Sequence, residues 1–173
     1  MVSTALFSVV MLISIGTIVS INNSNKKAQL SRTVMDNLNF AMENISRNLR
    51  VGVNYHCDIS ISPVTSPRDC STGADSIYFD GSHSAGESAQ IVYRLNRDTR
   101  QIERSIDGGS TFISLTSPEL SIDNLSFFVT GTSSHDGKQP KVVIVIGGSA
   151  IFKQGVNFNF SIQTMISQRR LDS

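Results

Sequence analysis

The sequence predicts an α+β protein in which a long N-terminal α-helix, first transmembrane and then amphipathic, is packed on an antiparallel β-sheet head. Three observations predict this class. Residues 1–25 carry no charged side chain, residues 30–49 repeat apolar side chains at helical spacing, and a period of two begins near residue 54. We therefore divide the chain into an apolar helix half (1–25), an amphipathic helix half (26–53) and a β-rich head (54–173).

Composition excludes some functional classes. The 173 residues include 15 Lys and Arg against 14 Asp and Glu, so the net charge is +1. This near-balance argues against a strongly basic nucleic-acid binder. Charged residues make up only 17% of the chain, because the first 25 residues have none. The two cysteines, Cys57 and Cys70, can form one disulfide in an oxidising compartment, and two free thiols are the alternative.

The run from Met1 to Ile21 predicts a transmembrane helix. Its polar members are Ser and Thr, whose hydroxyls can bond to the preceding helical turn. About 20 residues at 1.5 Å each cover the ~30 Å hydrocarbon core of a bilayer. The alternatives are a buried core helix and a signal peptide, although no basic residue precedes the run. The nearest basic residues, Lys26, Lys27 and Arg32, follow it. The positive-inside rule alone would place the head in the cytoplasm, whereas paired cysteines favour the outside.

A helical stripe continues directly after the apolar run. No Pro occurs in residues 1–62, and Gly52 suits a helix C-terminus. We therefore expect a single helix from about residue 2 to about residue 52. Its second half should pack on the sheet through apolar residues spaced by 3, 4, 3 and 4 positions: Met35, Leu38, Met42, Ile45 and Leu49.

The remainder of the sequence predicts strands that are joined by hairpins in one antiparallel sheet. Turns are expected at 96–98 and 107–109, and loops at 81–88, 131–140 and 147–155. Strands are expected, from alternation or from continuous apolar runs, at 75–80, 91–95, 101–106, 111–115, 125–129, 141–146 and 156–166.

The sequence offers no catalytic, cofactor or metal constellation, so we expect a protein that is not an enzyme. His56, His83 and His135 are isolated, and His56 beside Cys57 lacks metal-ligand spacing. Nucleophile-elbow, P-loop, zincin and dinucleotide motifs are missing. Arginines near one hairpin and at the end of the last strand could contact nucleic-acid phosphates, but a solvated face is favoured: Arg97, Arg100, Arg104, Arg169 and Arg170.

Three segments resemble type IV pilins and pseudopilins. The stem of these proteins is similar to VSTALFSVVMLISIGTIVSINNSNKKAQ. Larger minor pilins and type II secretion minor pseudopilins contain a Tyr-x-Leu…Arg hairpin that is similar to AQIVYRLNRDTRQIERS. The C-terminal part of these proteins is similar to PKVVIVIGG…FNFSIQTMISQRR. Family members begin with a basic leader, a peptidase site and a Glu. Val2–Phe7 align just after that Glu, so we expect the leader and the first mature residues to precede Met1.

The resemblance implies a structural, minor subunit of a type IV pilus or a type II secretion-like pseudopilus. Residues 1–25 would be the filament-core half of the stem. The implied partners are other pilin or pseudopilin subunits, the inner-membrane assembly platform, prepilin peptidase, and membrane lipid before assembly. Nucleic acid is not favoured as a partner. Assembly and membrane contacts would run through Val2, Leu6, Phe7, Val9, Val10, Leu12, Ile13, Ile15, Gly16, Ile18 and Val19.

The implied location is a single pass through the cytoplasmic membrane with the head outside, and the cell surface after assembly. One alternative function keeps the same architecture. The chain would then be a membrane-anchored extracytoplasmic binding module, such as an adhesin or a DNA receptor, that does not polymerise.

Overall fold

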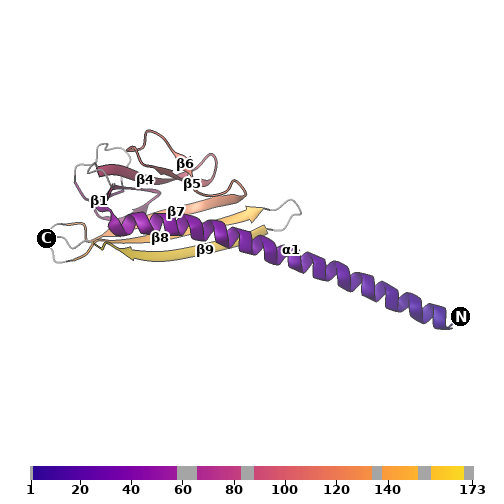
Figure 1. Cartoon of the computed structure of the whole chain (residues 1–173). Helices are drawn as coiled ribbons and strands as arrows, with labels where there is room; N and C mark the ends of the chain where they lie inside the picture. The colour runs from indigo at the N-terminus through magenta and orange to yellow at the C-terminus, as the bar shows by residue number, and fades with distance from the viewer. Residues whose placement is uncertain (1, 58–65, 83–87, 134–137, 152–156, 170–173) are drawn as a thin grey trace. The chain divides into compact units, whose positions relative to one another are not determined.

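The computed structural model describes residues 2–57, 66–82, 88–133, 138–151 and 157–169 (Figure 1). The chain is an α+β protein with a long N-terminal helix followed by antiparallel strands. It divides into two compact units, Met1–Asp36 and Asn37–Ser173.

Helix α1 (Val2–Val51) confirms the expected single helix. Its sequence contains no Pro and one Gly, so no strong helix breaker interrupts it, and the Asn-rich run at 22–25 is helical. Gly52 follows the helix, and its N–H donates to the Asn48 carbonyl at 3.0 Å. A Cβ at Gly52 would lie 2.4 Å from Phe79 Cδ2, so a residue without a side chain is needed where the helix meets the head.

The second unit contains two antiparallel sheets rather than the single sheet expected. The first sheet has the order β1-β3-β4-β5-β6 and the second has the order β2-β7-β8-β9. The first comprises β1 (Val53–His56), β3 (Ser76–Ser82), β4 (Ser88–Asn96), β5 (Gln101–Ser105) and β6 (Ile113–Ser114). The second comprises β2 (Cys70–Ala74), β7 (Leu120–Thr130), β8 (Lys141–Ile151) and β9 (Asn157–Ser167).

The core of the second unit is built from alternating apolar residues of both sheets. In the four-stranded sheet, Phe127 of β7 and Ile144 of β8 are register partners, and both are fully buried. In the other sheet the Phe79 and Tyr93 rings stack with centroids 6.0 Å apart. β7 packs against β3, β4 and β5 of the other sheet. Each large apolar side chain buried in this way contributes about 1.5–3 kcal/mol.

Two expectations about the head need correction, and one strand was missed. The loop expected at 147–155 is wrong over 147–151, which belong to β8. A Cβ at Gly148 would lie 2.3 Å from the Ser121 carbonyl oxygen, so the glycine there permits close strand approach and does not make a turn. The strand expected at 111–115 is reduced to the two residues of β6. Strand β2 was not expected, because its sequence, CSTGA, has no large apolar residue to mark a buried face.

Candidate functional site

The first half of α1 is long and apolar enough to span a membrane. An 18-residue window in it has a mean hydropathy of 2.2, and none of that window is buried. This exposure argues against the alternative of a buried core helix for this segment. The predicted membrane-contact residues from Val2 to Val19 are all exposed, including Leu12 at 70% and Ile18 at 67%. A helix that is apolar on all sides and exposed needs lipid or other chains to cover it.

Three polar side chains of this segment bond within the helix. Ser8 Oγ donates to the Thr4 carbonyl at 2.9 Å, and Ser14 Oγ donates to the Val10 carbonyl at 2.8 Å. Thr17 Oγ1 donates in the same way to the Ile13 carbonyl at 2.8 Å. A hydroxyl whose proton is already bonded to the preceding turn loses little on transfer from water into lipid. These three residues are therefore compatible with a membrane-spanning helix.

The second half of α1 presents a buried stripe in the second unit. Leu38, Ile45 and Leu49 are fully buried, as is Ala41, and Met42 is half-buried. Met35, the first member of the predicted stripe, lies in the first unit and is 38% exposed. Within the second unit the centre of the stripe thus runs through Ala41 rather than Met42.

Polar contacts fix the end of the helix to the head. The Tyr93 hydroxyl of β4 accepts from Asn48 Nδ2 at 2.6 Å and lies 2.8 Å from Asn44 Oδ1, to which it donates. Arg104 Nη1 also donates to Asn44 Oδ1, at 3.4 Å. Burial raises the pKa of the Tyr93 hydroxyl, although the Asn48 hydrogen bond and the Arg104 charge oppose the rise. In the sequence, the i,i+4 spacing of Asn44 and Asn48 places both amides on one face of the helix. No sequence pattern indicates that Tyr93 contacts them.

The predicted disulfide joins Cys57 and Cys70, whose Cα atoms are 6.2 Å apart. Beside it, Asp69 accepts hydrogen bonds from the Thr132 N–H at 2.9 Å, from Thr132 Oγ1 at 2.8 Å and from the Gly131 N–H at 3.3 Å. Burial raises the pKa of Asp69, but these bonds and the Lys138 charge outweigh it, so the pKa is lowered overall. The disulfide therefore attaches the start of β2 to the end of β1, and Asp69 attaches it to the end of β7.

Small-molecule chemistry has little support in the described residues. A cavity of about 180 Å³ lies beside the disulfide, lined by residues that include Arg68 and Thr72, and one of about 80 Å³ lies between Tyr55 and Pro140. Both volumes are below the range typical of ligand sites. The described part of the chain contains no group of three or more potential metal ligands. His56 lies buried in β1, and His83 and His135 lie outside the described residues.

Two of the five arginines considered for phosphate contact are paired with carboxylates. Arg97 pairs with Asp75 at 2.9 Å, and Arg100 pairs with Asp123 at 3.0 Å. An arginine already neutralised by a carboxylate attracts a phosphate less than a free one does. Arg169 is exposed, and Arg170 lies outside the described residues. The described arginines therefore do not form a uniformly cationic surface.

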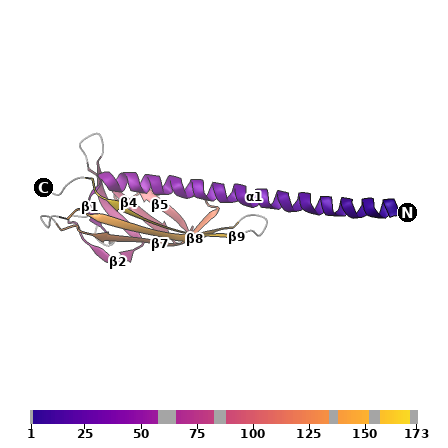
Figure 2. The same ribbon diagram turned by 90° about the horizontal axis from the view of Figure 1, so that it is seen from below.

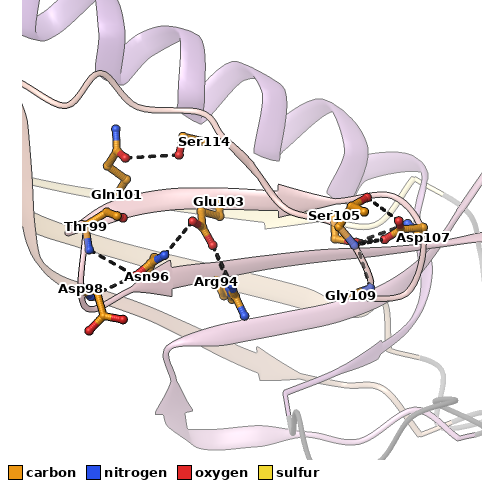
Figure 3. Close-up of polar contacts among 11 residues, drawn as sticks. Arg94, Asn96, Asp98, Thr99, Gln101, Glu103, Ser105, Asp107, Gly109 and Ser114 are labelled. Carbon is orange, nitrogen blue, oxygen red and sulfur yellow. Dashed lines mark hydrogen bonds and ion pairs between the residues drawn. The ribbon is translucent and has the colours of Figure 1, made fainter.

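Two polar clusters close the hairpin turns on either side of β5 (Figure 3). Asn96 Oδ1 accepts from the N–H groups of Asp98 and Thr99, while its Nδ2 donates to Glu103 Oε1 at 2.8 Å. In the next turn Asp107 accepts from Ser105 Oγ at 2.5 Å and from the hydroxyl and N–H of Thr111. The Ser105 bond, followed by the Thr111 bonds, lowers the pKa of Asp107 well below its usual range. Both turns were predicted from the sequence, and both clusters are structural.

Comparison with known proteins gives no family assignment, since no family model, no curated protein and no solved structure matches the chain. The fold and the exposed apolar helix are therefore the observations from which function is argued.

Proposed function

We propose that this chain is a structural, minor subunit of a type IV pilus or a type II secretion-like pseudopilus, assembling through α1. The observation that carries the proposal is the exposed apolar first half of a 50-residue helix whose second half carries a buried stripe in a β-rich unit. This architecture is compatible with the pilin resemblance of the sequence.

The proposed mechanism is packing rather than catalysis. In the membrane, lipid covers the apolar segment, and in a filament neighbouring stems replace the lipid. Because lipid is as apolar as the side chains, the hydrophobic effect contributes little to this exchange. Close van der Waals contact must contribute instead, and Gly16 favours it, because it has no side chain and the space beside it is open to a neighbouring helix. The assembly platform would supply the remaining work.

Immunolabelling in the native cell tests the proposal. Antibodies raised against the head should label surface filaments in electron micrographs and should detect the chain in the membrane fraction of cells that are not assembling filaments. Absence of the chain from both filaments and membrane would refute a filament subunit.

Deletion of residues 1–25 distinguishes the alternative binding module. A filament subunit loses incorporation and function together when its stem is removed. If the truncated chain kept full ligand binding and cellular function, the membrane-anchored module would replace the proposal.

A further inference from the structure

Strand β9 forms a long edge of the four-stranded sheet. It is the last strand in the order β2-β7-β8-β9, so no strand follows it in the described part of the chain. All eleven residues, Asn157–Ser167, pair with β8 without any shift of register. In Figure 1 it forms the margin of the sheet. The N–H and C=O groups of roughly every second residue in such a strand point away from its single neighbour.

The other three sheet edges have features that discourage pairing with another chain. β6 has only two residues. β1 has four residues, a register shift, and Asn54 at a positive φ of 57°. β2 has five residues, a register shift, and Gly73 at a φ of 81°. Short length, bulges and irregular backbone are the usual means by which proteins prevent edge-to-edge association.

β9 has none of these features. Its sequence, NFNFSIQTMIS, contains no charged residue, no Pro and no Gly. Its outward side chains Asn159, Ser161, Gln163 and Met165 are exposed, the last at 63%, whereas Phe160 and Ile166 face the core and are buried. A regular, uncharged strand of this length is a template for the addition of another strand.

We propose that β9 binds β9 of a second copy of this chain, antiparallel and about a two-fold axis at Ile162, to give one eight-stranded sheet. Ile162 is the middle residue of the strand, so this register pairs the whole of β9. A two-fold axis perpendicular to the sheet keeps the buried faces of both copies on the same side, because side chains alternate with a period of two.

Side-chain chemistry favours the second copy as the occupant. The register places Phe160 opposite Thr164 of the second copy, and Phe158 opposite Ile166 of the second copy, which are aromatic–β-branched pairs of the kind that stabilise sheets. On the outward face Ser161 lies opposite Gln163 of the second copy. Because β9 carries no charge, self-pairing brings no like charges together.

This contact goes beyond the proposed function and does not depend on it. A two-fold axis across β9 reverses the direction of the second copy, whereas the subunits of a filament all point the same way. The contact therefore joins heads of two separate assemblies, and it would exist whether or not α1 polymerises.

Cysteine cross-linking between two full-length chains in detergent tests the register. One chain carries Ser161→Cys and the other, with a different tag, carries Gln163→Cys, while Cys57 and Cys70 remain in their own disulfide. Mild oxidation of the mixture should give the mixed disulfide dimer as the main product, because only this pair is directly opposed. Three results would each overturn the proposal: no cross-linked dimer, dimers of the Ser161→Cys chain alone as the main product, and preferential cross-linking of Ser161→Cys to a Ser71→Cys chain through β2.

A charge substitution tests the surface without cysteine chemistry. Gln163→Lys places a lysine on the β9 edge, and Ser71→Lys places one on the opposite edge of the same sheet. The dimer is measured by sedimentation in density-matched detergent. Gln163→Lys should abolish it, whereas Ser71→Lys should leave it unchanged. Both variants should keep the circular-dichroism spectrum of the wild type. A full-length wild-type chain that is monomeric, or equal effects of the two variants, would contradict the proposal. Filament labelling should be unaffected by Gln163→Lys, so failure here is separable from failure of the proposed function.

Discussion

Arg94 of β4 lies directly opposite Glu103 of β5, and its Nε and Nη2 atoms are each 2.9 Å from Glu103 Oε2 (Figure 3). Glu103 is only 7% exposed, and the Arg94 guanidinium lies 3.4 Å from the centroid of the Phe112 ring. The buried carboxylate therefore bonds to a partly exposed cation, one side of which is covered by an aromatic ring.

Glu103→Gln should destabilise the head by about 1–3 kcal/mol, because a partly buried guanidinium loses its charged acceptor. The measurement is urea unfolding followed by far-ultraviolet circular dichroism, since the chain has no Trp for fluorescence. A double-mutant cycle with Arg94→Met should give a coupling energy above about 0.5 kcal/mol.

The exposed pair of Arg97 and Asp75 is the matched control. Their side chains are 75% and 41% exposed, so Asp75→Asn should cost less than about 1 kcal/mol. Equal losses of unfolding free energy for Glu103→Gln and Asp75→Asn would show that burial of Glu103 contributes nothing to the stability of the head.

Gly148→Ala should destabilise the four-stranded sheet. The added Cβ would lie 2.3 Å from the Ser121 carbonyl oxygen and 2.9 Å from Phe160 Cζ, so β7 and β8 would have to separate. Overpacking of this kind costs about 1–3 kcal/mol. For a chain of this size the melting temperature falls by roughly 2–4 °C for each kcal/mol.

The neighbouring glycine provides the control for that experiment. At Gly147 the nearest atoms to an added Cβ lie 4.0 Å away, so Gly147→Ala should leave the melting temperature unchanged or slightly raised. Equal melting temperatures for the Gly148→Ala and Gly147→Ala chains would contradict the close approach of β7 and β8.

Asp69 should make the stability of the head depend on acid pH. Its folded-state pKa is lowered from the ordinary value of 3.8. The contribution of Asp69 to the free energy of unfolding is therefore complete above pH 3.8, and it is lost as the pH falls through the folded-state pKa. The free energy of unfolding, measured from about pH 6 down to acid, should therefore fall less steeply in Asp69→Asn than in the wild type.

Thr132→Val tests the origin of that effect. The variant removes the hydroxyl donor but keeps the Thr132 and Gly131 N–H groups, so the folded-state pKa of Asp69 should rise toward its ordinary value. The loss of stability in acid that is due to Asp69 should therefore be smaller than in the wild type and should level off at a higher pH. An Asp69→Asn profile that overlays the wild-type profile would show that Asp69 is not the group responsible.

The sequence predicted the helix, the turns and most strands because each depends on local pattern. A 3.6-residue period and the lack of Pro before residue 63 were enough to predict α1 as one helix, and Asn96 and Asp107 marked two turns correctly. The disulfide followed from the presence of two cysteines, which can form one disulfide in an oxidising compartment.

The division of the strands into two sheets could not be predicted in the same way. It depends on which strands pair across long sequence separations, as β2 does with β7. Gly147 and Gly148 fall in the loop expected at 147–155, and the role of Gly148 in β8 depends on Ser121, a residue far away in the sequence. Likewise, the open edge of β9 is visible only once the strand order is known.

The membrane assignment of α1 can be tested by one charge in its apolar half. Val10→Asp places a carboxylate in the middle of the exposed apolar run, and a central Asp opposes insertion of a helix by about 2.5–3.5 kcal/mol. In cells producing the full chain, the fraction retained in membranes after alkaline carbonate extraction should fall strongly. Ser24→Asp, on the same helix but beyond the apolar run, should remain in the membrane like the wild type. Full retention of Val10→Asp would mean that this helix does not cross the bilayer, and the proposed filament stem would lose its support, whereas the β9 contact would not.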